Sequence, residues 1–313
     1  MNHKIIVTGY NSPDIDGAGG AYAYAELLRV QGVDTVPVVF GKLRNESKFA
    51  FEKAGIEATP GEKNYKHGDK VILVDCCEIK GMLPLIDPND VIEAIDHRAV
   101  HNANKEFPNA KIQVEIVGAA VTMIVEKFIK SAIIPTRESA LLLYLAIASN
   151  TVNFKNKVTT KRDIEAAEYL KNLYKFDNGL VHEMFVEQSR ISGTAREIFK
   201  RDKWINEIMG TVFALYQLEI VEVDEFVEKN IDEIKQSLHE VQIEGNLDFA
   251  MLTCVDLDKA RNTFVVPDKQ NEDLIGGILD VKFTDGVAHY PEIIMRKEIM
   301  PKIREYLIQN TTK

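Results

Sequence analysis

Apolar and polar positions along the first 180 residues predict short buried strands that alternate with helices. Ile5-Ile6-Val7 is apolar, and an alanine- and leucine-rich stretch with helical spacing follows it. The stretch VILV at 71–74 is continuously apolar, as strands of a buried parallel sheet are. This alternation predicts an α/β fold with a doubly wound parallel sheet. We expect strands at 5–7, 35–40, 70–74 and 91–95, and helices at 17–30, 46–54, 117–131, 138–149 and from Thr159 or Thr160 onward.

The pattern changes after about residue 179, and it predicts a second, smaller domain of the α+β class. Strands are expected in TVFALYQLEIV, FAMLTCVDL and NTFVVPD, with helices at 223–242 and 302–309. We therefore expect an N-terminal domain over 1–188 and a C-terminal domain over 192–313.

Composition narrows the class of protein. The 313 residues carry a formal net charge of −10, which disfavours binding to a nucleic-acid duplex, because that needs a basic face. No apolar run approaches the roughly 20 residues that span a bilayer, so we expect no membrane association. The three cysteines make no disulfide framework, and a reduced cytoplasmic location is the simplest interpretation.

Acidic side chains follow three of the predicted strands. Asp14 and Asp16 follow the first, Asp75 follows the third, and Asp96-His97 follow the fourth. The carboxyl ends of parallel strands form the crevice in which ligands bind, so these side chains should converge. Carboxylates with an imidazole suit Mg²⁺ or Mn²⁺. The alternative for Asp14 and Asp16 is a helix cap followed by a solvated turn.

Several motifs resemble those of a known family. SPDIDGAGGAYAYAELL, VILVDCC, AIDHR and VEIVGAAVTMI look like the four N-terminal motifs of the DHH phosphoesterase superfamily. The C-terminal MRKEIMP resembles the signature of its DHHA2 branch. That branch includes the manganese-dependent family II inorganic pyrophosphatases, the exopolyphosphatases and the prune-like proteins. The resemblance implies a DHH domain, a DHHA2-like domain and an active site in the cleft between them.

The resemblance also implies roles for individual residues. Asp14, Asp16, Asp75 and His97 match metal ligands of the family, and Asp96 matches a residue that orients His97. The side chains implied to contact the phosphate groups of a substrate are Arg98, Lys203, Arg296 and Lys297. The implied catalytic set is Asp14, Asp75, His97 and Arg98.

Three positions depart from the pattern of the pyrophosphatases. Tyr10 stands where they have a histidine ligand, and a phenol is a poor ligand at neutral pH. Arg98 replaces a second histidine and offers a planar fork of donors suited to phosphate, as in prune-like proteins. Asn150 replaces an aspartate, and its carbonyl oxygen can still coordinate a metal without adding charge.

The expected activity is hydrolysis of phosphoanhydride bonds in pyrophosphate or a short polyphosphate by a metal-activated water. We expect one Mn²⁺ or Mg²⁺ held firmly by Asp16, Asp75 and His97, and a second recruited with the substrate through Asp14 and Asp75. One alternative is a degenerate family member that binds a phosphate or nucleotide without efficient turnover. Another is a phosphodiesterase that acts on a small nucleotide. The resemblance also implies a homodimer.

Overall fold

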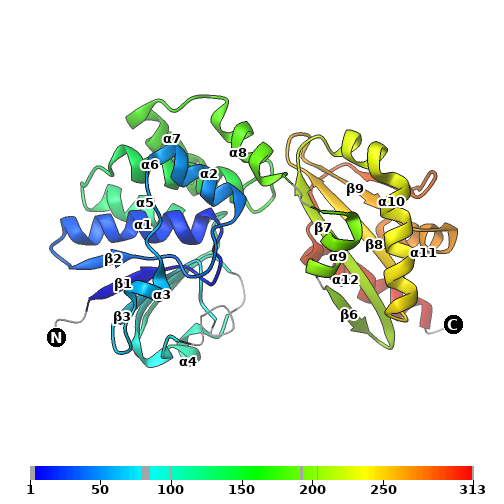
Figure 1. The fold of residues 1–313 in the computed structure, drawn as a ribbon, viewed down its shortest axis with the longest axis horizontal. Coiled ribbons are helices and arrows are strands. Elements are labelled where there is room, and N and C mark those ends of the chain that lie inside the picture. The colour runs from blue at the N-terminus through cyan, green and yellow to red at the C-terminus, as the bar shows by residue number, and fades with distance from the viewer. Residues whose placement is uncertain (1–3, 79–84, 99–100, 191–192, 203, 312–313) are drawn as a thin grey trace. The chain divides into compact units, whose positions relative to one another are not determined.

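The computed structural model describes residues 4–78, 85–98, 101–190, 193–202 and 204–311. The chain divides into two compact units, Met1–Glu187 and Gln188–Lys313 (Figure 1). None of the helices in the described ranges combines the length and the hydropathy that crossing a bilayer requires.

The first unit is built on a parallel sheet of five strands in the order β2-β1-β3-β4-β5. The chain adds β2 on one side of β1 and then crosses to add β3 on the other side. At such a reversal the loops after the two central strands diverge, which opens a place for a ligand at their carboxyl ends. The strands are β1 (Ile5–Thr8), β2 (Thr35–Pro37), β3 (Lys70–Val74), β4 (Val91–Asp96) and β5 (Lys111–Val114).

Helix α1 (Ile15–Val30) packs tightly against this sheet because its first turns carry glycine. A Cβ added at Gly20 would lie 2.7 Å from Val74 in β3 and 2.8 Å from Val121 in α5. Gly20 therefore lets α1, α5 and the sheet approach one another closely. The other helices of the unit are α2 (Asn45–Ala54), α3 (Gly61–Asn64), η2 (Pro88–Asp90), α4 (Ala103–Glu106), α5 (Ala120–Lys130), α6 (Arg137–Asn150), α7 (Lys161–Tyr174) and α8 (Leu180–Gln188).

The predicted α/β fold is confirmed, and the differences concern particular ends and edges. β2 ends at Pro37 instead of residue 40: the amide of Val38 still donates to the carbonyl of Val7 (2.9 Å), but Val39 pairs with Pro60 in an isolated bridge. α5 begins at Ala120 instead of 117, because residue 119 is still extended. β5 was not predicted, since this short edge strand has only one partner strand and no fully buried side chain.

The second unit contains a mixed sheet in the order β10-β9-β8-β7-β6. β7 and β8 are parallel, and the other neighbouring pairs are antiparallel. Its strands are β6 (Ile205–Ile208), β7 (Thr211–Ile220), β8 (Phe249–Asp256), β9 (Arg261–Val265) and β10 (Val287–Tyr290). Its helices are α9 (Ala195–Asp202), α10 (Val223–Glu244), α11 (Lys269–Leu279) and α12 (Arg296–Thr311).

Alternation along β7 gives this sheet two apolar faces. Ala214 and Tyr216 belong to a core that includes Ile234 and Leu238 of α10, the long yellow helix in Figure 1. Phe213 and Leu215 belong to a second core with α11 and α12. The final helix starts at Arg296, six residues before the predicted 302, so Arg296 and Lys297 lie in its first turn.

Candidate metal site

Asp14 caps the helix that follows β1. Its Oδ1 accepts hydrogen bonds from the backbone N–H groups of Asp16 (3.1 Å) and Gly17 (3.2 Å), at the first turn of α1. A cap of this kind satisfies amide groups that have no partner inside the helix. The helix-cap interpretation of the sequence therefore describes Asp14, and one of its carboxylate oxygens is already occupied.

Asp16, two positions later, is fully buried and faces a different helix. Its Oδ2 accepts from the amide of Ala120 (2.7 Å) and its Oδ1 from the amide of Val121 (2.8 Å), at the N-terminus of α5. Burial and the nearby Asp75 carboxylate raise the pKa of Asp16 well above its usual value, against the opposing effect of His97. The solvated turn expected as the alternative is therefore wrong for this residue.

Asp75 directly follows β3 and turns the chain at the end of the strand. Its φ of 55° lies in the left-handed region, which aspartate tolerates better than most residues. Its amide donates to the carbonyl of Ile95 in the neighbouring strand (2.8 Å). Burial and the Asp14 carboxylate raise the pKa of Asp75 to about 7, against the effect of a hydrogen bond with His97.

His97 directly follows β4, and both of its ring nitrogens have partners. Nδ1 lies 3.1 Å from the carbonyl oxygen of Val117, so Nδ1 carries the proton and donates it there. Nε2 then lies 3.5 Å from Asp75 Oδ1 and 3.8 Å from Asp16 Oδ2. Burial lowers the pKa of His97, but the two carboxylates outweigh burial and raise it to about 10. The buried carboxylate of Asp96 accepts the backbone N–H of His97 (2.6 Å), which fixes the start of the loop.

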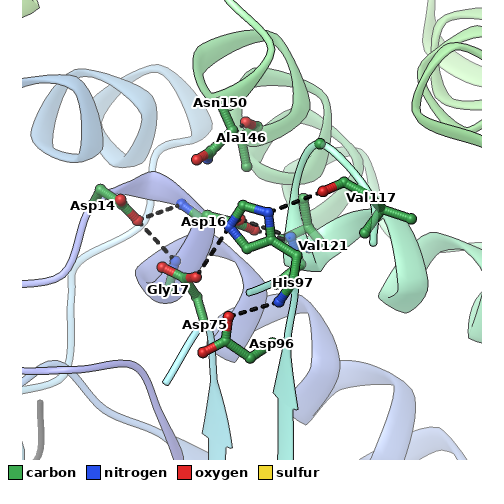
Figure 2. Close-up of polar contacts among 12 residues, drawn as sticks. Asp14, Asp16, Gly17, Asp75, Asp96, His97, Val117, Val121, Ala146 and Asn150 are labelled. Carbon is green, nitrogen blue, oxygen red and sulfur yellow. Dashed lines mark hydrogen bonds and ion pairs between the residues drawn. The ribbon is translucent and has the colours of Figure 1, made fainter. Parts of the chain in front are cut away.

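Asp16, Asp75 and His97 thus come together at the carboxyl ends of the central strands (Figure 2). One donor atom from each lies within 4.8 Å of the other two. Two buried carboxylates so close together repel each other, and a divalent cation removes that repulsion. Oxygen ligands with one neutral imidazole nitrogen suit Mn²⁺ or Mg²⁺, so the three residues fit such an ion.

Asp14, Tyr10 and Asn150 have other partners close by. Asp14 is not one of the three residues whose donor atoms lie within 4.8 Å of one another. The hydroxyl oxygen of Tyr10 accepts the amide N–H of Asp14 (3.2 Å), and burial raises the pKa of this phenol, which keeps it protonated. The side-chain amide of Asn150 donates to the carbonyl of Ala146 in its own helix (3.3 Å). Figure 2 shows Asn150 on α6, drawn beside this group.

Arg98 follows His97 and is exposed, in contact with acidic groups. Its Nε lies 3.5 Å from Asp96 Oδ2, and its Nη1 lies 3.6 Å from Glu78 Oε2. Its amide also donates to Asp96 Oδ1 (3.2 Å). Asp96 therefore fixes the backbone of both His97 and Arg98, while the guanidinium group remains within reach of solvent.

The remaining residues of the expected phosphate-binding set belong to the second unit. The Nη1 of Arg296 donates to the carbonyl of Leu215 (3.0 Å), and its guanidinium lies 4.8 Å from the ring centroid of Trp204. Lys297, beside it in α12, is exposed. Lys203 lies outside the described residues.

Sequence reasoning missed the main-chain groups that hold two of the three donor side chains. These are the carbonyl of Val117 and the amides of Ala120 and Val121. Their side chains are apolar, so residue chemistry gave no sign of this role. The only signal was the resemblance of VEIVGAAVTMI to a family motif.

Comparison with protein families gives one match in the N-terminal unit. Residues 4–147 match the model of the DHH family, N-terminal domain. This range includes Asp16, Asp75 and His97.

Whole-length relatives and solved structures extend this likeness to the second unit. A Methanothrix thermoacetophila protein named manganese-dependent inorganic pyrophosphatase is 30% identical over 262 residues, which cover 83% of each chain. A Clostridium acetobutylicum protein, named as a probable enzyme of the same kind, is 26% identical over 97% of this chain and 98% of its own.

Among solved structures, a Methanococcus jannaschii protein classed with the family II inorganic pyrophosphatases has a TM-score of 0.70 at 24% identity, over 96% of this chain and 99% of its own. An exopolyphosphatase-related protein from Bacteroides fragilis has a TM-score of 0.50 at 13% identity, over 99% and 93% of the two chains. The two structures are similar to this chain in fold.

Proposed function

This chain belongs to the DHH family, together with the manganese-dependent inorganic pyrophosphatases, and on that premise we propose that it hydrolyses phosphoanhydride bonds of pyrophosphate or a short polyphosphate. The observation that carries the proposal is the convergence of Asp16, Asp75 and His97 where the strand order reverses. Buried acids at the carboxyl ends of parallel strands suit a cation and, through it, an anionic substrate.

The proposed cofactor is Mn²⁺ or Mg²⁺, held by Asp16, Asp75 and His97. A divalent cation in such a site supplies a water that is nucleophilic at neutral pH and neutralises charge on the phosphate groups. The Nδ1–H of His97 is bound to Val117, so its Nε2 faces the two carboxylates. A second ion, if recruited with the substrate, would use Asp14 Oδ2, Asp75 and the carbonyl oxygen of Asn150, because Asp14 Oδ1 already caps α1.

The basic residues of the chain would bind and orient the phosphate groups. Arg98 presents a planar fork of donors beside His97, and a phosphate oxygen would compete with Glu78 for it. This exchange costs little, because an exposed ion pair contributes at most about 1 kcal/mol to stability. We assign Lys203, Arg296 and Lys297 the same task for a small phosphorylated substrate.

Tyr10 favours a second candidate, a protein that binds phosphate without efficient turnover. Its protonated phenol accepts the amide of Asp14 and offers no anionic oxygen where the resemblance implies a histidine ligand. With Asn150 uncharged, the site has fewer anionic ligands for a second ion. Binding of one ion and a phosphate compound, with slow or absent hydrolysis, would follow.

The test is phosphate release from pyrophosphate and tripolyphosphate with Mn²⁺, with Mg²⁺ and with a chelator. We expect metal-dependent release that falls by about 10³-fold in Asp75→Ala, because cation charge stabilisation is worth several kcal/mol. The matched control is Asp69→Ala, which removes a buried aspartate from the opposite end of β3, where it accepts the amide of Lys66 (2.8 Å).

The outcomes separate the two candidate functions. Release that is unchanged in Asp75→Ala contradicts the metal assignment. Calorimetric uptake of Mn²⁺ by a wild-type protein that releases no phosphate from either substrate supports the binding protein instead.

A further inference from the structure

Asp163 is a fully buried aspartate in the first turn of α7. Its Oδ2 accepts from the amide and the hydroxyl of Thr160, each at 2.7 Å, in a capping box at the start of this helix. A capping box is a local motif, in which the N3 side chain accepts the N-cap amide and the N-cap side chain accepts the N3 amide. The same carboxylate, however, makes two further hydrogen bonds to a distant part of the chain.

Those two bonds reach the segment that precedes and begins α5. Oδ2 of Asp163 accepts the amide of Gly118 (2.8 Å), and Oδ1 accepts the hydroxyl of Thr122 (2.6 Å). Oδ2 therefore receives three donors and Oδ1 one. A carboxylate, which only accepts hydrogen bonds, matches such a set of donors.

The segment 117–121, which Asp163 contacts at Gly118, holds two of the three candidate metal ligands. The carbonyl of Val117 accepts from His97 Nδ1 (3.1 Å), and the amides of Ala120 and Val121 bind the two oxygens of Asp16. Gly118 allows the close approach, because a Cβ there would lie 2.7 Å from Thr151 Cγ2 and 2.8 Å from Asp163 Oδ2. The position of this backbone thus sets the direction of both ligand side chains.

We propose that Asp163 is a positioning residue for the metal site, acting through the backbone of residues 117–121. The inference rests on the metal site of the proposed function but does not depend on the reaction or on its substrate. Without the carboxylate, Gly118 loses its acceptor, and the carbonyl and amides that hold His97 and Asp16 are released together. Partners that orient metal ligands typically contribute 10- to 100-fold to affinity.

The test is Mn²⁺ binding by calorimetry, with hydrogen–deuterium exchange of the 117–121 amides in the metal-free protein. We expect Asp163→Ala to lower the affinity for Mn²⁺ by about 10-fold or more and to speed exchange at Ala120 and Val121. Asp163→Asn should recover much of the Mn²⁺ affinity and of the protection from exchange. Its amide oxygen still accepts from Gly118, and its NH₂ group can donate to Thr122. The control is Asp256→Ala, which removes a buried carboxylate that binds backbone amides in the second unit.

Each outcome decides the proposal. Affinity within twofold of wild type in a folded Asp163→Ala protein overturns it, as does an equal loss in Asp256→Ala. If Asp163→Ala does not fold, Gly118→Ala serves in its place, because the added Cβ pushes the same contact apart, and unchanged Mn²⁺ affinity there also overturns it. If the wild type takes up no Mn²⁺, the proposed function fails, while unchanged exchange at 117–121 separately overturns the positioning role.

Discussion

Asp75 and Asp256 occupy equivalent places in the two units, yet their surroundings are opposite. Each stands at the carboxyl end of a buried central strand, β3 in one case and β8 in the other. Oδ1 of Asp256 accepts the amides of Asp258 (3.1 Å) and Lys259 (2.8 Å), and its Oδ2 lies 4.0 Å from Arg261 Nε. Asp75 instead faces Asp16 and His97.

This difference shows when an aspartate at a strand end can act as a ligand. Oδ1 of Asp256 has two amide donors in its own turn, and Arg261 compensates the charge of the carboxylate as an ion pair, although Oδ2 has no hydrogen-bond partner among the described residues. Asp75 shares its space with a second buried carboxylate, and its charge is compensated only in part by His97. A divalent cation, as proposed above, would compensate the charge of the second arrangement, whereas the first has an arginine beside it.

The largest expected effect is on the stability of the metal-free protein. The folded-state pKa of Asp75, about 7, lies above its unfolded value of 3.8, so ionisation of Asp75 costs stability as the pH rises from 3.8 to 7. Asp75→Asn avoids this cost, and at pH 8 it should raise the free energy of unfolding by about 1 to 4 kcal/mol. Urea unfolding in the presence of a chelator measures the change.

Asp256→Asn is the matched variant, and we expect a change of opposite sign. The amide cannot compensate the charge of Arg261, whose buried Nε has no hydrogen-bond partner among the described residues and lies 4.0 Å from Asp256 Oδ2. The free energy of unfolding should fall by about 1 to 3 kcal/mol. If both variants shift the urea midpoint in the same direction, the contrast between the two strand ends is wrong.

The next effect is the pH dependence of Mn²⁺ binding. Metal binding requires Asp75 ionised and His97 neutral, and their pKa values of about 7 and about 10 mean that protons must leave. Affinity should therefore rise with pH, by at least about tenfold per unit above pH 7 and more steeply below it, since ionisation of Asp16, whose pKa is also raised, adds to the proton release. Calorimetry from pH 6 to 8 in two buffers with different ionisation enthalpies measures both affinity and proton release. Affinity independent of pH contradicts the assignment of these ligands.

The smallest expected effects concern Arg98 and Arg261, the arginines beside the two strand ends. Arg98→Ala should raise the KM for pyrophosphate by about tenfold, through loss of one charge-assisted contact with phosphate, at a stability cost under about 1 kcal/mol. Arg261→Ala should leave KM unchanged and cost about 1 to 3 kcal/mol, because it also binds Asp224. Steady-state kinetics measures KM, and urea unfolding measures the stability of each variant. Equal KM values in wild type and Arg98→Ala contradict a substrate contact at this position.

Much of the fold follows from the sequence because local patterns and burial agree. Lys70–Val74 was predicted to the residue, since a short run of four apolar side chains between polar residues is typical of a strand buried on both faces. Thr160 was predicted as one of two caps, and the structure has it as the N-cap of α7. The short edge strands β5, β6 and β10 escaped prediction because few of their side chains are buried.

The sequence by itself determined which residues could supply the chemistry: acids and a histidine that follow apolar strands, within motifs that resemble those of one family. It assigned Asp16 to the first expected ion and Asp14 to the second, but it could not show which groups of the protein hold these two side chains. Only the tertiary structure assigned one to the cap of its own helix and the other to the amides of α5. The physical reason is that a carboxylate is directed by the donors around it, and the donors of Asp16 lie more than 100 residues away along the chain.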